Sequence, residues 1–106
     1  MKSIDHIALR VSNIKESIEF YSDNFGAEII SEYEDWAFLR FENVKLALIG
    51  SNKHPEHIAF EVEDLHTLEA LGAPVLHHRD GTHSSYIKDV NGNFVEYIFY
   101  GKNYEK

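Results

Sequence analysis

The sequence predicts an α+β fold built from two copies of one β-α-β-β-β module. The chain of 106 residues nearly repeats itself about halfway along: residues 4–11 read Ile-Asp-His-Ile-Ala-Leu-Arg-Val, and residues 55–62 read Pro-Glu-His-Ile-Ala-Phe-Glu-Val. Both segments alternate in the way a strand does, and a helix start follows each. We therefore expect a single domain over residues 1–106, with module one at 1–50 and module two at 55–100.

Module one should contain one strand, one long helix and three further strands. Asn13 has the side chain of a helix N-cap, and Gly26 stands where a left-handed residue closes a helix. The apolar residues between them form one stripe on a helix, Ile14, Ile18, Tyr21 and Phe25. The strands of this module are expected at residues 3–12, 27–33, 35–41 and 44–50.

Module two should follow a polar connection at residues 51–55. Its helix starts at Asp64 and closes at Gly72, so it is one or two turns shorter than the first. Asn91-Gly92 predicts a hairpin turn, because both residues tolerate positive φ. The polar tail, residues 101–106, is expected to fray. The strands of this module are expected at residues 56–62, 74–78, 83–88 and 94–100.

The composition indicates a globular protein with one packed core. Hydrophobic residues make up 43% of the chain and aromatic residues 13%, which is enough for a packed core. The absence of cysteine excludes disulfide and thiolate chemistry and fits a cytoplasmic location. We expect no membrane partner, since no stretch is apolar enough for a signal peptide or a bilayer span. The net charge of −8, with scattered Lys and Arg, argues against nucleic acid.

Two histidines occupy the same position in the two copies. His6 and His57 should lie on the strand face opposite the large aliphatic residues, which should meet the helices. Glu96 lies inside the apolar last strand, where a carboxylate is costly to bury without a partner. Two imidazoles and one carboxylate are a ligand set for a divalent metal with open positions, such as Fe, Mn, Zn, Ni or Co. The structural alternative is a hydrogen-bonded polar cluster without metal.

Several other residues are candidates for the surroundings of that metal. His83 or Ser85 could face the cavity, and His83 is the candidate for handling a proton; an exposed strand edge is the alternative. The remaining candidates for a substrate pocket are Arg10, Trp36, Phe38, Glu61, Ser85 and Phe94. Of these, Arg10 and Glu61 could instead form a structural ion pair, and the two aromatic residues Trp36 and Phe38 could belong to the core. The neighbours His77 and His78 should point to opposite sides of a strand.

Three motifs in order resemble the vicinal oxygen chelate superfamily of glyoxalases, extradiol dioxygenases, fosfomycin-resistance enzymes and methylmalonyl-CoA epimerases. They are His6-Ile7-Ala8 with Ser17 to Tyr21 and Phe25-Gly26, then His57 to Phe60, and finally Tyr86 to Glu96. The resemblance covers nearly the whole chain. It implies that the paired modules form an open, cavity-lining barrel around a metal held by His6, His57 and Glu96, and that the protein is a homodimer.

One departure from the family pattern bears on the reaction. Glyoxalases of this family usually place a fourth ligand, a glutamate, on the last strand of the first module, but here leucine or alanine stands in the matching stretch, residues 44–49. The three-ligand set resembles that of the extradiol dioxygenases or the fosfomycin-modifying thiol transferases more than that of the glyoxalases. Taken as a whole, the resemblance implies a small metal-dependent lyase, transferase or dioxygenase that chelates vicinal oxygens of a small substrate. The alternative is a non-catalytic protein of the same fold that binds a small molecule, for example an antibiotic, and needs no metal.

Overall fold

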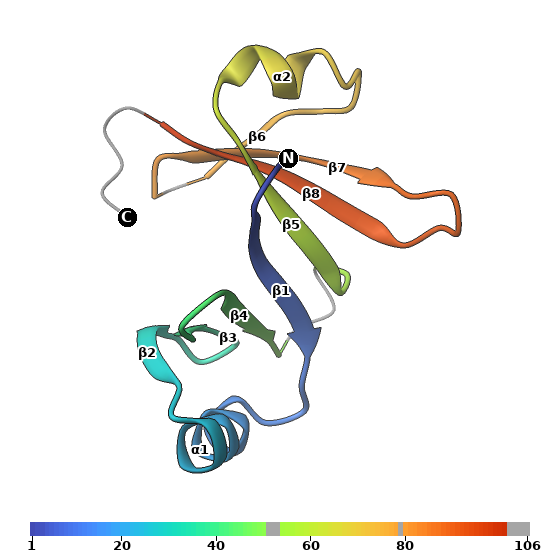
Figure 1. The fold of residues 1–106 in the computed structure, drawn as a ribbon. Coiled ribbons are helices and arrows are strands. Elements are labelled where there is room, and N and C mark those ends of the chain that lie inside the picture. Colours follow the sequence, from blue (N-terminus) through green and yellow to red (C-terminus); the bar gives the residue numbers. More distant parts are fainter. Residues whose placement is uncertain (51–53, 79, 102–106) are drawn as a thin grey trace. The chain divides into compact units, whose positions relative to one another are not determined.

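The computed structural model describes residues 1–50, 54–78 and 80–101 (Figure 1). The chain forms two compact units, one made of His6–His57 and the other of Met1–Asp5 with Ile58–Lys106. Most of the expected polar connection and of the expected frayed tail lies outside the described residues. No helix in the described part of the chain is long and apolar enough to cross a bilayer.

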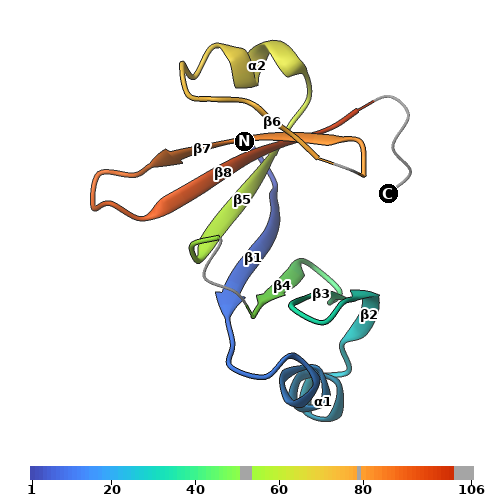
Figure 2. The same cartoon turned by 180° about the vertical axis from the view of Figure 1, so that it is seen from behind.

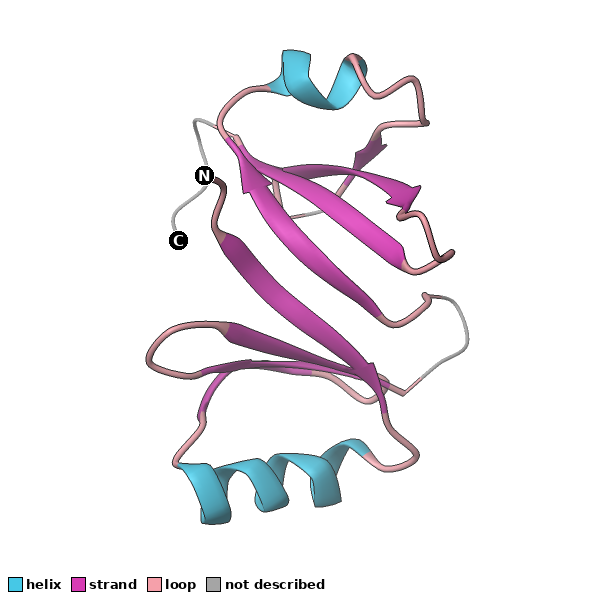
Figure 3. Cartoon of the chain, turned by 45° about the vertical axis from the view of Figure 1, so that its right-hand side comes forward, coloured by secondary structure: helices cyan, strands magenta, loops and turns pink. Residues whose placement is uncertain are grey.

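The unit His6–His57 contains one helix and a mixed four-stranded sheet. Its strands lie in the order β2-β3-β4-β1; β3 is antiparallel to β2 and β4, whereas β4 is parallel to β1. In Figure 3, α1 runs along one side of these strands. The elements are β1 Ile4–Arg10, which begins in the other unit, α1 Ile14–Phe25, β2 Glu28–Glu32, β3 Trp36–Arg40 and β4 Lys45–Ile49.

Helix α1 begins and ends where its local signals predict. The Asn13 side chain accepts a hydrogen bond from the backbone N–H of Glu16 at 3.0 Å, which satisfies one of the free donors of the first turn. Gly26 closes the helix with φ of 70°, a conformation that costs glycine no Cβ clash. Phe25 does not join the buried stripe: it is 63% exposed and packs against the ring of Phe20 on the helix surface.

Replacing Asn13 with alanine should lower the free energy of unfolding by about 1 kcal/mol, because the N–H of Glu16 loses its acceptor. Urea unfolding monitored by far-UV circular dichroism measures this change. Ser12→Ala, at the exposed residue before the cap, is the matched control and should have little effect. Equal destabilisation by both substitutions would contradict the capping role.

The two faces of this sheet carry different residues. One face packs against α1, and its core is Ile14, Ile18, Ala37, Leu39, Leu46 and Leu48, with Ile7, Leu9 and Val11 against it. The expectation that the aliphatic residues of the first strand meet the first helix is thus confirmed. The other face carries Ala8, Ala47 and Ile49, with Trp36 and Phe38 packed beside them.

The second unit repeats the arrangement of the first. Its strands lie in the order β5-β8-β7-β6, which matches β1-β4-β3-β2, and α2 lies on one side of β7 and β8 (Figure 2). The predicted pair of β-α-β-β-β modules is therefore confirmed. The elements are β5 His57–Val62, which begins in the other unit, α2 Leu65–Glu69, β6 Leu76–His77, β7 Thr82–Lys88 and β8 Phe94–Tyr100.

Helix α2 is shorter than predicted at its C-terminal end. Asp64 caps it as expected, accepting from the backbone N–H of Thr67 at 2.8 Å. The helix ends at Glu69, and the N–H of Gly72 then bonds to the carbonyl of Glu69 in a tighter turn. Five residues cover less of the sheet than the twelve of α1. Ile58, expected to face the helix, is consequently 42% exposed.

The turn between β7 and β8 has five residues, 89–93, as the predicted strands 83–88 and 94–100 imply, and Asn91 and Gly92 lie within it. The Asp89 carboxylate accepts from the backbone N–H groups of Asn91 and Asn93, and these hydrogen bonds lower the pKa of Asp89. Within this turn only Gly92 has positive φ, at 84°; Asn91 does not, because every described residue with positive φ is a glycine. The turn sets a register in which Lys88 is opposite Phe94 and Tyr86 is opposite Glu96.

Candidate functional site

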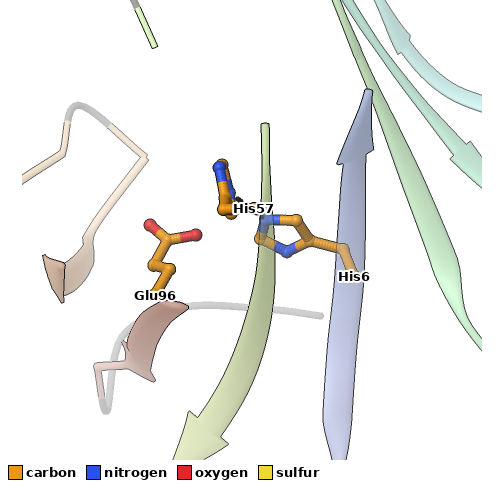
Figure 4. Close-up of side chains that lie close together, drawn as sticks. All are labelled: His6, His57 and Glu96. Atoms are coloured by element: carbon orange, nitrogen blue, oxygen red, sulfur yellow. Dashed lines mark hydrogen bonds between the residues drawn. The ribbon is translucent and has the colours of Figure 1, made fainter. Parts of the chain in front are cut away.

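The two repeated histidines face each other within the unit His6–His57. Their Nε2 atoms are 3.2 Å apart, and both side chains are buried, 7% and 8% exposed (Figure 4). Nδ1 of His57 lies 2.9 Å from the carbonyl oxygen of Pro55. Because a carbonyl can only accept, Nδ1 of His57 carries a proton, so the neutral ring presents a lone pair at Nε2. Backbone hydrogen bonds of this kind orient histidines that bind metals.

The separation of these nitrogens fits a shared cation. Metal–imidazole bonds are about 2.0–2.1 Å long, so two nitrogens on adjacent positions of a tetrahedral or octahedral ion lie about 2.9–3.4 Å apart. The observed 3.2 Å falls within this range. The pair can therefore bind one ion without rearrangement of the backbone.

Glu96 lies on β8 in the other unit, directly opposite Tyr86 of β7. The carboxylate is 4% exposed, and the hydroxyl of Tyr86, directly opposite on β7, donates a hydrogen bond to it. Burial, together with the adjacent Glu96 carboxylate, raises the pKa of Tyr86 above its ordinary value. Tyr86 therefore stays protonated at neutral pH and remains a donor that orients the carboxylate.

Sequence reasoning did not select Tyr86, although a signal for it existed. In an antiparallel pair, residues directly opposite share a face, so the length of the turn decides which residue of β7 faces Glu96. A five-residue turn at 89–93 pairs Tyr86 with Glu96. The Asp89 side chain, a strong former of such turns, was the signal.

Replacing Tyr86 with phenylalanine should leave unchanged the amount of tyrosinate that forms below about pH 11. Tyrosine ordinarily ionises near pH 10, and the raised pKa of Tyr86 keeps its phenol protonated in that range. The ionisation of the six tyrosines of the chain is measured by the absorbance of the folded protein as the pH is raised. Tyr33→Phe, at a site 62% exposed, controls for the loss of one chromophore. A drop in amplitude by one tyrosine in the Tyr86 variant would contradict the raised pKa.

Aromatic residues line the histidine face of the first unit. The edge of Phe38 meets the ring of His6, with centroids 5.4 Å apart. Trp36 stacks on Phe38 at 5.6 Å, and Tyr33 stacks on Trp36 at 5.4 Å. Trp36 and Phe38 therefore lie on the same face as His6, packed beside Ala8, Ala47 and Ile49, in a row that ends at the exposed Tyr33. Nζ of Lys45 lies 5.2 Å above the Phe38 ring.

These features agree with the comparison of the chain with protein families. The model of the Glyoxalase/Bleomycin resistance protein/Dioxygenase superfamily matches residues 3–97. The chain belongs to this superfamily. The match spans both units and includes both histidines and Glu96, so the resemblance predicted from the sequence motifs is confirmed.

Individual relatives support the same assignment. The chain is 40% identical to the metallothiol transferase FosB of Staphylococcus haemolyticus strain JCSC1435, over 60% of this chain and 52% of the relative. It thus spans about half the length of that protein. Among solved structures, the fold matches the hypothetical protein BH1468 from Bacillus halodurans C-125, with a TM-score of 0.74, 18% identity and 99% of each chain covered. It also matches methylmalonyl-CoA epimerase from Mycobacterium tuberculosis, with a TM-score of 0.70, 17% identity, and 93% and 88% of the chains covered.

His83 and Ser85 do not lie on the face of β7 that carries Tyr86. They are opposite Phe99 and Tyr97 on β8, and alternate residues of a strand point to opposite faces. The Ser85 hydroxyl is buried and donates to the carbonyl of Pro74. The structure therefore does not bring the candidate proton-handling residue to the side of Glu96.

The other pocket candidates have specific partners. The backbone N–H of Arg10 donates to the Glu56 carboxylate, and its guanidinium donates to the carbonyl of His54, so Arg10 holds the segment before β5. Glu61 is half-buried on β5 and bonds through its backbone N–H to Ser3. Phe94 shares the strand face of Glu96, with Nζ of Lys88 5.1 Å above its ring.

Proposed function

We propose that this chain is a small metal-dependent enzyme of the glyoxalase/dioxygenase type, in which His6, His57 and Glu96 bind one divalent cation. Each of these side chains offers one ligand atom of a type that first-row metals accept. The observation that carries the proposal is the histidine pair, whose buried Nε2 atoms are 3.2 Å apart. Glu96 is buried on β8, the last strand of the second module.

The bound metal would supply a Lewis acid that holds two neighbouring oxygens of a small substrate and stabilises negative charge as it develops on them. The residues of the chain prepare this chemistry. The Pro55 carbonyl fixes the tautomer of His57, so that a lone pair is presented. The Tyr86 hydroxyl holds the Glu96 carboxylate. The aromatic row from Phe38 to Tyr33 offers flat apolar surfaces to a substrate.

The residues of β4 favour transferase or dioxygenase chemistry over that of a glyoxalase. Lys45 is opposite His6 in the parallel β1–β4 pair, and Ala47 is opposite Ala8. The face that His6 shares with Ala47 and Ile49 therefore has no carboxylate on β4. A fourth, metal-bound glutamate that also moves a proton is missing from this strand. A relative at 40% identity is a metallothiol transferase, which supports the transferase alternative.

Metal analysis of the protein purified without chelator tests this function. We expect one equivalent of a divalent transition metal per chain, found directly or after reconstitution. Activity is then assayed on a panel of methylglyoxal–thiol adducts, catechols and fosfomycin. The proposal includes a cytoplasmic location and a homodimeric state. Sedimentation of the metal-loaded protein tests the homodimer. Absence of metal after reconstitution would overturn the enzyme assignment.

A binding protein of the same fold is the second candidate, and the aromatic row favours it. Tyr33, Trp36 and Phe38 stack in sequence, and such a wall can hold a planar or apolar ligand without chemistry. In that case, ligands should quench the fluorescence of Trp36, the one tryptophan of the chain, with equal affinity in the presence and absence of chelator. Quenching that requires metal supports the enzyme instead.

A further inference from the structure

A second pair of histidines lies on β6 and β7. His77 is directly opposite His83 in the antiparallel β6–β7 pair, so both side chains leave the same face of the strands. Their Nδ1 atoms are 2.6 Å apart, and the ring centroids are 4.7 Å apart at an interplanar angle of 81°. This face of β7 is the one opposite Tyr86 and Glu96. The pair is therefore separate from the residues of the proposed catalytic metal.

We propose that His77 and His83 form a second transition-metal site, in which two imidazole nitrogens bind one ion and water completes its coordination. Two nitrogens on one ion lie about 2.9–3.4 Å apart, as deduced from metal–imidazole bonds of about 2.0–2.1 Å. The two rings must therefore separate by about 0.3–0.8 Å from the present 2.6 Å. His77 is exposed, so a small side-chain rotation achieves this.

One ligand of this pair is held in place while the other can adjust. The ring of His83 stacks on Phe99, with centroids 6.0 Å apart and an interplanar angle of 23°. The backbone N–H of His78, which follows β6, donates to the carbonyl of Thr82 at the start of β7 at 2.8 Å, and this bond links the two strands. The Asp80 carboxylate accepts hydrogen bonds from the backbone N–H and the hydroxyl of Thr82, the residue before His83. A ligand that is already oriented costs less entropy when it binds.

The chemistry of the pair defines the class of ion. Imidazole nitrogens suit copper, nickel and zinc, and the affinity order for divalent ions places copper highest. Magnesium and calcium prefer oxygen ligands and should not compete. The acidic chain, with a net charge of −8, favours the approach of cations. With two protein ligands, this site should be weaker than one with three.

Calorimetric titration with ZnCl2 tests the site. We expect two binding steps for the unmodified protein, and the weaker step alone for the variant His6→Gln/His57→Gln. Adding His77→Gln/His83→Gln to that variant should abolish the remaining step. Because the second site is read in a background without the first pair, its failure is distinguishable from failure of the proposed function. A weaker step that persists without His77 and His83 would overturn the proposal.

A matched control removes the same number of histidines elsewhere. His54→Gln/His66→Gln changes two exposed residues and should keep the weaker step; its loss in this control would also overturn the proposal. Should the buried pair prove necessary for folding, imidazole signals in NMR spectra of the unmodified chain provide the second measurement. Zinc should shift the signals of His77 and His83, and unshifted signals at saturating zinc would refute the site.

Discussion

Replacing His6 with alanine is expected to weaken metal binding by more than about 100-fold. Loss of a residue that only orients a ligand typically costs 10–100-fold, and His6 is proposed as a ligand itself. The substitution leaves His57 with its lone pair in a buried site and no second imidazole beside it. Calorimetry with the reconstituting metal measures the affinity. Catalytic activity on any substrate of the unmodified protein should fall with it.

Two controls separate ligand loss from misfolding. His66→Ala removes an exposed histidine on α2 and should leave the affinity unchanged. Thermal unfolding of metal-free protein shows whether the His6 variant is folded. Metal at 100 times its dissociation constant stabilises the native state by about 2.7 kcal/mol, and this gain should vanish in the His6 variant. A stoichiometric, equally tight metal in that variant would rule out the proposed centre.

Replacing Leu48 with alanine should lower the free energy of unfolding by about 2–5 kcal/mol, since it removes buried methyl groups and leaves a cavity. Leu48 is fully buried on β4, among Ile18 of α1 and Leu39 of β3. A loss of this size is a large part of the 5–15 kcal/mol typical of natural domains. Urea unfolding followed by circular dichroism measures it.

Leu76→Ala is the matched control, because it removes the same atoms from a side chain that is 40% exposed on β6. It should cost much less, since little apolar surface returns to water there. If both variants lost the same stability, the core assignment of Leu48 would be wrong.

Features with purely local causes were predictable from the sequence. Asn13 and Gly26 place the ends of α1 where the structure has them, because a side-chain cap and a left-handed glycine act on the adjacent turn. The strand Phe94–Tyr100 was predicted with its exact bounds. The paired modules were predictable because the chain repeats its own pattern, including His6 and His57.

The faces of β7 depend on the number of residues in one turn, and the dipeptide Asn91-Gly92 alone does not fix that number. A two-residue turn at Asn91-Gly92 would place Ile87 opposite Glu96 and put His83 and Ser85 on the Glu96 face. The five-residue turn that Asp89 organises shifts the register by one residue. A shift by one residue reverses every side chain of a strand, so Tyr86 replaces His83 beside the carboxylate.

The amino-acid order by itself determined the superfamily, the repeated module and the position of both candidate histidine ligands, since each rests on short motifs that recur or follow one another in a fixed order along the chain. Only the tertiary structure decided that the Nε2 atoms of the two histidines lie 3.2 Å apart, that Tyr86 holds Glu96, and that Ile58 is left uncovered by a short α2. Distances between strands and the faces they present depend on register and on the length of the covering helix. These are settled by packing between segments far apart in the chain.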